Sequence, residues 1–540
     1  MNKIALYLNE HIVGEVTSLR ALRRRFSQDA SVLTITPEIV VFPKVTNDIR
    51  KVARFAWQLA EKGHVMGITM RGAGTDMTGG AIGKGILINT TAHLTNILFI
   101  GPKERLVHIQ PGVSLKDLNE ALHWHGLSLP NAPSDGPATV GGVIANSVFG
   151  DRGSFANAIE KMEVILANGD VIETGRVSKR EVDKKKGLQT LEGEIYRQLD
   201  GIIEDNDTLI KALAKDTTPD RTAYKAIIRV KDKDGSMNLT PLLVGSQGTL
   251  GIISEIVLKT DFYNKDQAVV VAAISTKELA RDVVDSLKAL DPGVLEMIDG
   301  ELFAEAQEKG KKYPIFGNTA DLVGSGAIVY VSFNEPNDRA RNHKLKKAAK
   351  VLTKSNISFV TSENESLENM IALRDVTSVV AQSLNDSESM PPVVDGAFIP
   401  ADRHEEFASA LQELATKIHT TLPIKTNMLT GIIDVYPTLH LGEVSDKQKV
   451  FKLMNEYSAL VDRCGGSFIA DGSEGRLKAN AAWALLDDQT VLLYEQVRKA
   501  FDPFGTLNPG VKQKNDIKHL VEALRPTYDN ADLIDRGFTR

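Results

Sequence analysis

Apolar and polar positions in the first hundred residues alternate between strand-like runs and one helical stripe. Residues 36–44 (TPEIVVFPK) form the short apolar run typical of a buried strand. Residues 46–63 then repeat apolar side chains every three or four positions, with Thr46 as the expected N-cap and Gly63 as the end. Residues 64–70 return to a strand pattern. The pattern therefore predicts a β-α-β unit with two parallel strands.

The rest of the chain reads as further strands followed by a helix-rich half. Residues 85–90, 96–100 and 105–110 are short strands, and 114–126 is a helix capped by Ser114 and closed by Gly126. Residues 159–175 predict a β-hairpin with a type I′ turn at Asn168-Gly169. Residues 182–240 are a charged, helical insertion, and 242–259 is again strand-like. From about 265 to 500, amphipathic helices alternate with strands, which indicates a separate α+β domain.

Composition narrows the functional class without defining it. The chain has 540 residues, 42% hydrophobic and 25% charged, with a formal net charge of −6. A nucleic-acid binder would carry a basic surplus, so none is expected. The single cysteine, Cys464, excludes an intrachain disulfide and a cysteine-ligated iron–sulfur cluster. The N-terminal residues do not resemble a signal peptide and no run is long enough to span a bilayer, so we expect a cytoplasmic protein, with peripheral membrane attachment left open.

A glycine-rich loop, MRGAGTDMTGG at residues 70–80, raises the question of a ligand. The dinucleotide fingerprint fails because Met77 stands at its third glycine and a strand follows. The P-loop pattern also fails, because Thr78 stands where its first glycine belongs. A nest of backbone N–H groups around an anion and a plain surface loop remain. A second glycine-rich stretch, 133–153, favours a ligand with two phosphates.

Several sequence blocks, in order, resemble one family. They are RGAGTDMTGGA, PGVSLKDLNEAL, PATVGGVIANSVFGDRG, VILANGDVIETG, LLVGSQGTLGIISEIVLK and FDPFGTLNPG. Together they resemble the FAD-linked oxidases of the vanillyl-alcohol oxidase and p-cresol methylhydroxylase (PCMH) family. The nearest branch is that of D-lactate dehydrogenase and glycolate oxidase. The resemblance is strong over residues 25–265 and weaker over 265–513.

The resemblance implies an α+β protein with a fixed order of parts. An N-terminal extension (1–34) would precede a PCMH-type FAD-binding domain of two α+β subdomains (35–263), interrupted by the helical insertion at about 182–240. An α+β substrate or cap domain (264–500), a short C-terminal segment that contacts the flavin (501–513) and a tail (514–540) would follow.

The resemblance also assigns a cofactor. Residues 71–79 would wrap the FAD diphosphate, with Pro133, Ser134 and residues 139–142 on its other side. Asn146, Gly150 and Gly153 would lie along the ribityl chain and flavin ring. Residues 248–253 would close over the adenine side, and Asn508 would complete the flavin pocket. Thr75 stands where covalent members often carry histidine, so the FAD is expected to be non-covalent. The residues assigned to FAD are Arg71, Gly72, Ala73, Gly74, Thr75, Asp76, Thr78, Gly79, Pro133, Ser134, Thr139, Val140, Gly141, Gly142, Asn146, Gly150, Gly153, Gly248, Thr249, Gly251, Ile252, Ile253 and Asn508.

The catalytic half departs from the family pattern. The family's two metal-binding motifs are altered here to GIIDVYPTLHLG and GGSFIADGSEG, which keep His440 and replace an acidic residue by Asp471. These two side chains with Asp434 could hold a divalent ion, but so few nitrogen ligands make a metal site the less favoured reading. His440 is then either a metal-free base or an ordinary residue at a strand end, and Tyr436 is the other candidate for catalysis.

Oxidation of a 2-hydroxy acid also needs a cation for the carboxylate. Arg374 and Arg476 are the candidates because a guanidinium binds a carboxylate through two parallel hydrogen bonds, although helical arginines are most often solvated. The sequence thus predicts a dehydrogenase for D-lactate-, glycolate- or D-2-hydroxyglutarate-like substrates. It would pass electrons to an external quinone, cytochrome, flavoprotein or oxygen. A non-acid alcohol as substrate and a non-catalytic flavin-binding subunit are the alternatives.

Overall fold

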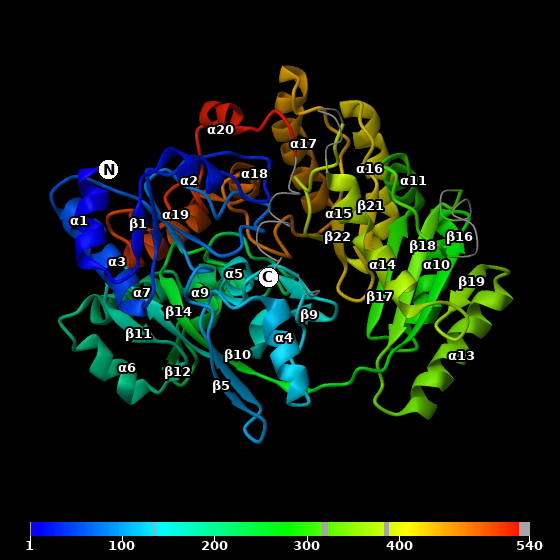
Figure 1. Ribbon diagram of the computed structural model, residues 1–540, viewed down its shortest axis with the longest axis horizontal. Coiled ribbons are helices and arrows are strands. Elements are labelled where there is room, and N and C mark those ends of the chain that lie inside the picture. The colour runs from blue at the N-terminus through cyan, green and yellow to red at the C-terminus, as the bar shows by residue number, and fades with distance from the viewer. Residues whose placement is uncertain (1, 134–135, 316–321, 323, 383–387, 529–540) are drawn as a thin grey trace.

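The computed structural model describes residues 2–133, 136–315, 322, 324–382 and 388–528. Figure 1 shows the N-terminal half and the last helices together on one side and a large sheet with its helices on the other. Within the described ranges, none of the helices combines the length and apolar character that crossing a bilayer requires.

A four-stranded sheet contains the predicted β-α-β unit. Its strands run in the order β1 (Glu15–Thr17), β2 (Ile39–Phe42), β4 (Ile86–Asn89), β3 (Ile68–Arg71), and β2 and β3 both pair with β4 in parallel. Helix α3 (Thr46–Glu61) links β2 to β3 and packs its apolar stripe on this sheet. The predicted cap is one residue off: Val45 is the N-cap, and the Asp48 carboxylate accepts hydrogen bonds from the preceding backbone N–H groups.

A five-stranded antiparallel sheet forms the second layer. Its order is β11 (Val171–Glu173), β10 (Ile159–Ile165), β14 (Ile252–Lys259), β6 (Leu106–Ile109), β5 (Ile97–Gly101). Helix α4 (Leu115–Trp124) has the predicted Ser114 cap, whose hydroxyl accepts from Asp117 N. The type I′ prediction at the β10–β11 turn is wrong. Gly169 has φ of 83° but Asn168 does not share a positive φ, which fits a three-residue loop ending in a left-handed glycine.

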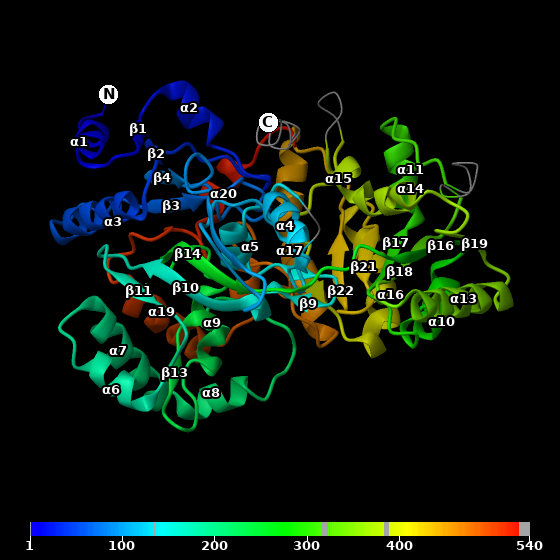
Figure 2. The same ribbon diagram turned by 60° about the horizontal axis from the view of Figure 1, so that its bottom comes forward.

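The charged insertion is helical, as predicted. It contains α6 (Lys179–Lys186), α7 (Leu191–Asp205), α8 (Asp207–Leu213), the 3-10 helix η2 (Lys225–Arg229) and α9 (Thr240–Leu243). Figure 2 shows α6, α7 and α8 at one end of the molecule. Helix α7 contacts α19 (Asp488–Phe501), so the insertion packs on the last part of the chain.

A seven-stranded antiparallel sheet forms the other side of the molecule. Its order is β19 (Ser358–Thr361), β16 (Ala268–Ile274), β18 (Ala327–Phe333), β17 (Val294–Asp299), β21 (Ile424–Asn427), β22 (Ile432–Val435), β20 (Ala397–Phe398). Successive residues of β16 alternate between two cores, as a strand covered on both faces requires. Helices α10 (Lys277–Lys288) and α13 (Asp338–Lys354) cover one face; α11 (Gly300–Glu308), α14 (Leu367–Ala372) and α15 (Val376–Ala381) lie on the other.

The turn-rich segment near residue 508 returns to the N-terminal sheet. Leu507 forms a parallel bridge with Ile68 at the edge of β3. Ile68 N donates to Thr506 O at 2.7 Å, and Asn508 N donates to Ile68 O at 2.8 Å. Residues more than four hundred positions apart therefore lie in one sheet edge. Helices α1 (Lys3–His11), α2 (Arg20–Arg25), α16 (His404–Ile418), α17 (Val444–Arg463), α18 (Ala479–Ala484) and α20 (Ile517–Ala523) complete the described part of the fold.

Candidate functional site

A cavity of about 280 Å³ lies where the two glycine-rich stretches meet the loop at 246–253. The first stretch contributes a continuous wall from Met70 to Met77, and the second contributes the beginning and end of α5 (Val140–Asn146). Of the residues assigned to FAD from the sequence, those that line this cavity are Arg71, Gly72, Ala73, Gly74, Thr75, Asp76, Pro133, Thr139, Gly141, Gly142, Asn146, Gly248, Gly251, Ile252 and Ile253.

The first loop presents a row of unpaired backbone donors to the cavity. In the described part of the chain, no residue accepts a hydrogen bond from the N–H groups of residues 72–77. Further along, Thr78 N and Gly80 N donate to the Asp76 carboxylate at 3.0 and 2.6 Å. Burial and the nearby Asp29 raise the pKa of Asp76 to about 6. The Asp76 carboxylate thus holds the end of the loop, while the N–H groups of residues 72–77, which line the cavity, stay free. Free N–H groups on a cavity wall suit a diphosphate.

The second loop places a short helix against the first. Thr139 is the N-cap of α5, and its hydroxyl oxygen accepts from Gly142 N at 3.2 Å. A Cβ on Gly72 would overlap that same hydroxyl oxygen and lie 3.1 Å from the Thr139 methyl carbon. The two glycine-rich stretches are therefore in direct contact, and the contact depends on glycine at position 72.

Other residues assigned to FAD do not line the cavity. They are Thr78, Gly79, Val140, Gly150, Gly153, Thr249 and Asn508, while Ser134 lies outside the described residues. Asn508 is almost fully buried. Its amide donates to Gly80 O at 2.8 Å and to Gln247 O at 2.7 Å, and its carbonyl oxygen accepts from Thr69 Oγ1 at 3.0 Å. This side chain joins the terminal segment to β3 and to two loops of the cavity.

Gln247 is a site residue that the sequence did not identify as important. It lines the cavity, and its amide nitrogen donates to Thr78 Oγ1 and to Asn146 Oδ1, each at 3.1 Å. Its carbonyl oxygen accepts from Gly475 N at 2.9 Å. A carboxylate at this position could not donate, so Gln247 makes a set of contacts that a glutamate could not reproduce.

Neither candidate arginine is free to bind a substrate carboxylate. Arg476 is buried and donates to the carbonyl oxygens of Gly79, Ile82 and Pro509, and burial lowers its pKa to about 10. Arg374 binds both carboxylate oxygens of Glu296, at 3.0 and 2.9 Å, and also contacts Asp151. Burial lowers its pKa, but these two carboxylates outweigh that effect and raise it. Arg476 therefore holds loops together, and Arg374 is already paired.

The two candidate bases also lie off the cavity wall. The side chain of His440 is half exposed, and its ring approaches the Asp446 carboxylate at 3.8 Å at the start of α17. Tyr436 is buried in the apolar cluster under α11, α14 and α15, and burial, with Asp434 second, raises its pKa well above the usual range. A neutral, buried phenol is a poor proton acceptor, so neither side chain is placed for the chemistry expected of it.

A different set of acidic residues lies close together, and one of them, Asp471, contacts the segment after α5. Asp471 Oδ1 accepts from Phe149 N at 2.8 Å, and Asp434 Oδ1 accepts from Gly396 N at 2.8 Å. Burial raises the pKa of Asp434 to about 6, with Asp395 as the second cause, and that of Asp471 to about 7, with Asp434 as the second cause. Lys478 Nζ donates to Asp395 Oδ1 at 2.6 Å. Across the described ranges, no group of three His, Cys, Asp or Glu side chains is arranged to hold a metal ion.

Asp471 does not line the cavity itself, but residues next to it in the chain and in space reach the cavity wall. Ser473 N donates to Asn146 Oδ1 at 3.0 Å, and Asn146 lines the cavity. The Asp471 partner, Phe149, follows Val148, which also lines it. Asp471 is partly accessible despite this position. The sequence singled it out only as a possible metal ligand, because the fold that brings 471–473 to α5 is not visible in a local pattern.

The fold and the cavity define a protein built to bind a diphosphate-containing dinucleotide through glycine loops. Comparison with family models makes this specific. Residues 37–175 match the family described as "FAD binding domain", and residues 264–511 match "FAD linked oxidases, C-terminal domain". The chain belongs to the PCMH-type FAD-linked oxidases, which confirms the predicted family, fold class and cofactor. The wall of glycines and free N–H groups fits FAD, whose diphosphate residues 72–77 would hold.

Curated relatives are distant in sequence. A D-2-hydroxyglutarate dehydrogenase from Haemophilus influenzae is 23% identical, and the match covers 96% of this chain but 53% of that protein. Glycolate oxidase subunit GlcD from Bacillus subtilis is 23% identical, and the match covers 91% of this chain and 92% of that protein. A D-lactate dehydrogenase from Archaeoglobus fulgidus is 24% identical, and the match covers 87% of this chain and 90% of that protein. The chain spans about half the length of the D-2-hydroxyglutarate dehydrogenases that it matches.

Solved structures support the same fold. A structure of p-cresol methylhydroxylase with substrate bound aligns with a TM-score of 0.67 at 12% identity, covering 95% of this chain and 98% of that one. An alkyldihydroxyacetonephosphate synthase aligns with a TM-score of 0.58 at 13% identity, covering 92% and 82%. At such identities the likeness concerns the fold alone.

Proposed function

We propose that the protein is an FAD-dependent oxidoreductase that oxidises a small 2-hydroxy acid to the 2-oxo acid. The observation that carries the proposal is the cavity, whose free backbone donors suit FAD and beside which the partly accessible carboxylate of Asp471 contacts Phe149 N. The curated relatives that match most of this chain, and most of whose own length is matched, include a glycolate oxidase subunit and D-lactate dehydrogenases. Bound FAD would supply the hydride acceptor.

Asp471 is the group that we assign to the proton. Oxidation of the alcohol to a carbonyl removes a hydride from Cα, for which bound FAD would be the acceptor, and a proton from the hydroxyl, for which a base is needed. Asp471 keeps one oxygen on Phe149 N at 2.8 Å, which orients the carboxylate and leaves its second oxygen without a recorded partner among the described residues. Its raised pKa, about 7, is close to the value that suits a base at neutral pH. We thus assign to Asp471 the role that was predicted for His440 or Tyr436 from the sequence.

The proposed electron acceptor is external to this chain. With only one cysteine, the chain cannot ligate an iron–sulfur cluster by itself, so electrons would leave to a quinone, a cytochrome, a flavoprotein or oxygen. We propose a non-covalent FAD, because Thr75 lines the cavity where a covalent histidine would otherwise stand.

An anaerobic substrate screen tests the proposal. Purified FAD-loaded protein is mixed with D-lactate, glycolate or D-2-hydroxyglutarate, and flavin absorbance near its visible maximum is followed. Bleaching by at least one of these acids, and not by the matching alcohol without a carboxylate, is expected. Bleaching only by non-acid alcohols would replace the substrate class, and no bleaching by any compound would favour a non-catalytic flavin-binding subunit.

A further inference from the structure

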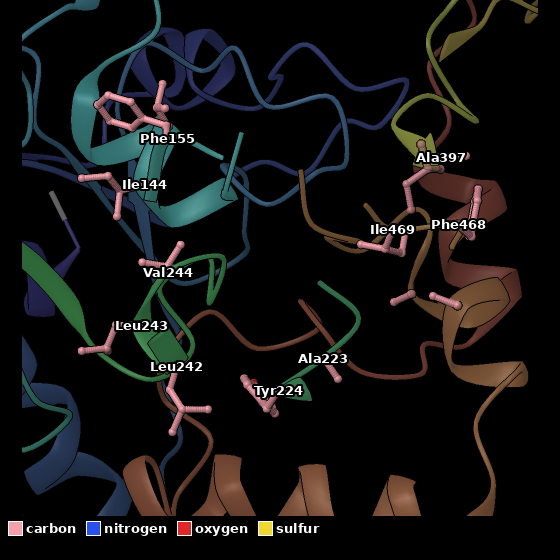
Figure 3. Packing of buried hydrophobic residues seen from close by; sticks show 14 of the residues in the cluster. Ile144, Phe155, Ala223, Tyr224, Leu242, Leu243, Val244, Ala397, Phe468 and Ile469 are labelled. Atoms are coloured by element: carbon pink, nitrogen blue, oxygen red, sulfur yellow. The ribbon is translucent and has the colours of Figure 1, made fainter. Parts of the chain in front are cut away.

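Arg221 lies in the helical insertion, yet its backbone is fixed between two segments of the candidate site. Arg221 N donates to Ile469 O at 2.7 Å, two residues before Asp471. Arg221 O accepts from Lys512 Nζ at 3.1 Å, in the terminal segment. Figure 3 shows Ala223 and Tyr224, which follow in the chain, in the same buried cluster as Phe468 and Ile469. The insertion therefore places Arg221 near the junction of the cavity and the seven-stranded sheet.

The guanidinium of Arg221 is only partly satisfied. Its Nη2 donates to Ser154 Oγ at 3.2 Å, whereas its Nε is buried without a hydrogen-bond partner. Within the described ranges no carboxylate oxygen lies within the 4.0 Å that defines an ion pair with it, unlike the pairing of Arg374 with Glu296. Arg221 as a residue is partly exposed, but its Nε is buried, and an unmade hydrogen bond of a buried charged group is costly. The Nε and Nη2 groups share one edge of the guanidinium, which is the edge that binds a carboxylate through two bonds.

Arg221 and Asp471 each contact one strand of the same β-hairpin. Phe149 and Ser154 face each other in the β8–β9 pair (Phe149–Gly150 and Gly153–Ser154). Asp471 accepts from Phe149 N, and Arg221 donates to Ser154 Oγ. A base and a cation therefore flank one cross-strand pair without pairing with each other. The hairpin follows Val148, the last residue of this stretch on the cavity wall.

We propose that Arg221 binds the carboxylate of the substrate beside Asp471. This inference rests on the proposed oxidation of a 2-hydroxy acid and names its carboxylate site. A 2-hydroxy acid carries its carboxylate and its hydroxyl on adjacent carbons, so it needs a cation and a base close together but not in contact. Of the other cations near this junction, Arg374 and Lys425 contact Glu296, and Arg476 holds backbone carbonyls. Arg229 is also near Arg221, but it lies exposed at the surface.

The test compares Arg221→Met with Arg152→Met in FAD-loaded protein. Arg152 is the matched control, because it lies in the turn of the same hairpin and pairs with Asp291 on the exposed surface. For the best 2-hydroxy acid of the screen, Arg221→Met should lower kcat/KM at least 100-fold, mainly through KM. The rate with the methyl ester of that acid should fall less than threefold. Arg152→Met should stay within twofold on both compounds. Arg221→Lys should recover about tenfold of the loss, because it keeps a charge and loses the two-bond geometry.

Two further measurements distinguish failure of the proposed carboxylate site from misfolding of the variant and from failure of the proposed oxidation. FAD content and unfolding temperature show whether Arg221→Met folds; if it does not, Arg221→Lys and Arg221→Gln carry the comparison. Oxalate, which cannot be oxidised here by hydride transfer, is titrated by its perturbation of the flavin spectrum. Loss of oxalate binding only in the Arg221 variants supports the site even if no hydroxy acid is oxidised. Acid kinetics within threefold of the unchanged protein in a folded Arg221→Met variant overturns it.

Discussion

Replacing Gly72 by alanine should weaken FAD binding through a clash that the structure locates to one neighbour. The new Cβ would overlap the Thr139 hydroxyl oxygen, closer than the 3.0 Å that real Cβ atoms respect, and would lie 3.1 and 3.2 Å from the other two carbons of that side chain. Either the first loop withdraws from the cavity, or Thr139 rotates and its hydroxyl leaves Gly142 N. Both movements displace a wall of the cavity.

The size of the effect follows from these two costs. Overpacking of a tight interior costs about 1–3 kcal/mol, and loss of an N-cap hydroxyl costs about 1 kcal/mol. If roughly 2 kcal/mol is expressed in binding, the Kd for FAD rises about 30-fold. Thr139→Ala removes the overlapping oxygen and the methyl carbon and leaves only the contact at 3.2 Å. The double variant Gly72→Ala/Thr139→Ala should therefore bind FAD within about fivefold of Thr139→Ala alone, because the two changes are coupled.

Quenching of FAD fluorescence on titration with apoprotein measures these four affinities. Gly201→Ala is the control, since a Cβ there meets no atom within 4 Å and the residue lies in α7. It should bind FAD like the unchanged protein. Unchanged affinity in Gly72→Ala, or a double variant as weak as the product of the single losses, would refute the contact between the two glycine-rich stretches.

Three further changes test other parts of the molecule. Lys512→Met leaves the Glu474 carboxylate, which is 0% exposed, without its ammonium partner and should lower the free energy of unfolding by about 3–5 kcal/mol. In chemical denaturation, adding Glu474→Gln should recover most of this loss of stability. No recovery in the double variant would contradict the pairing. Asp471 must be deprotonated to act as a base, so kcat/KM should rise with pH through about 7. Because the folded protein holds this proton more tightly than the unfolded chain, the free energy of unfolding should fall as pH rises from 3.8 to about 7. Asp471→Asn should remove both pH dependences, and their persistence in this variant would mean that another group causes them. Arg374→Met should lower the unfolding temperature, with partial recovery in a double variant carrying Glu296→Gln, whereas a selective rise in KM would instead indicate substrate binding.

Local sequence patterns correctly predict those elements that are determined by interactions between neighbouring residues. The stripe of α3 and the Ser114 cap need only a few neighbouring residues, and both are present. The glycine loops could be identified as a cofactor site because close approach of a backbone to a ligand excludes side chains. The type I′ assignment at Asn168-Gly169 failed because the same dipeptide also ends a longer loop.

The catalytic side could not be predicted in the same way, because its residues meet only through the tertiary fold. Arg374 and Arg476 were chosen for their chemistry, but whether a guanidinium is free depends on partners far away in sequence, such as Glu296 or the carbonyl of Ile82. Arg221 lies in a charged insertion, where nothing in the local sequence separates it from solvated neighbours. His440 kept its place in a family motif, but its side chain is half exposed in a segment after β22.

The anchoring of Asn508 has a consequence for the order of events during synthesis. Its amide reaches Gly80 O across 428 positions of sequence, and Gln247 O across 261. Proteins fold progressively as they leave the ribosome, N-terminal parts first. Here the first glycine loop emerges early but gains its contact with Asn508 only after more than four hundred further residues, so we expect stable uptake of the flavin to follow synthesis of the segment around Asn508.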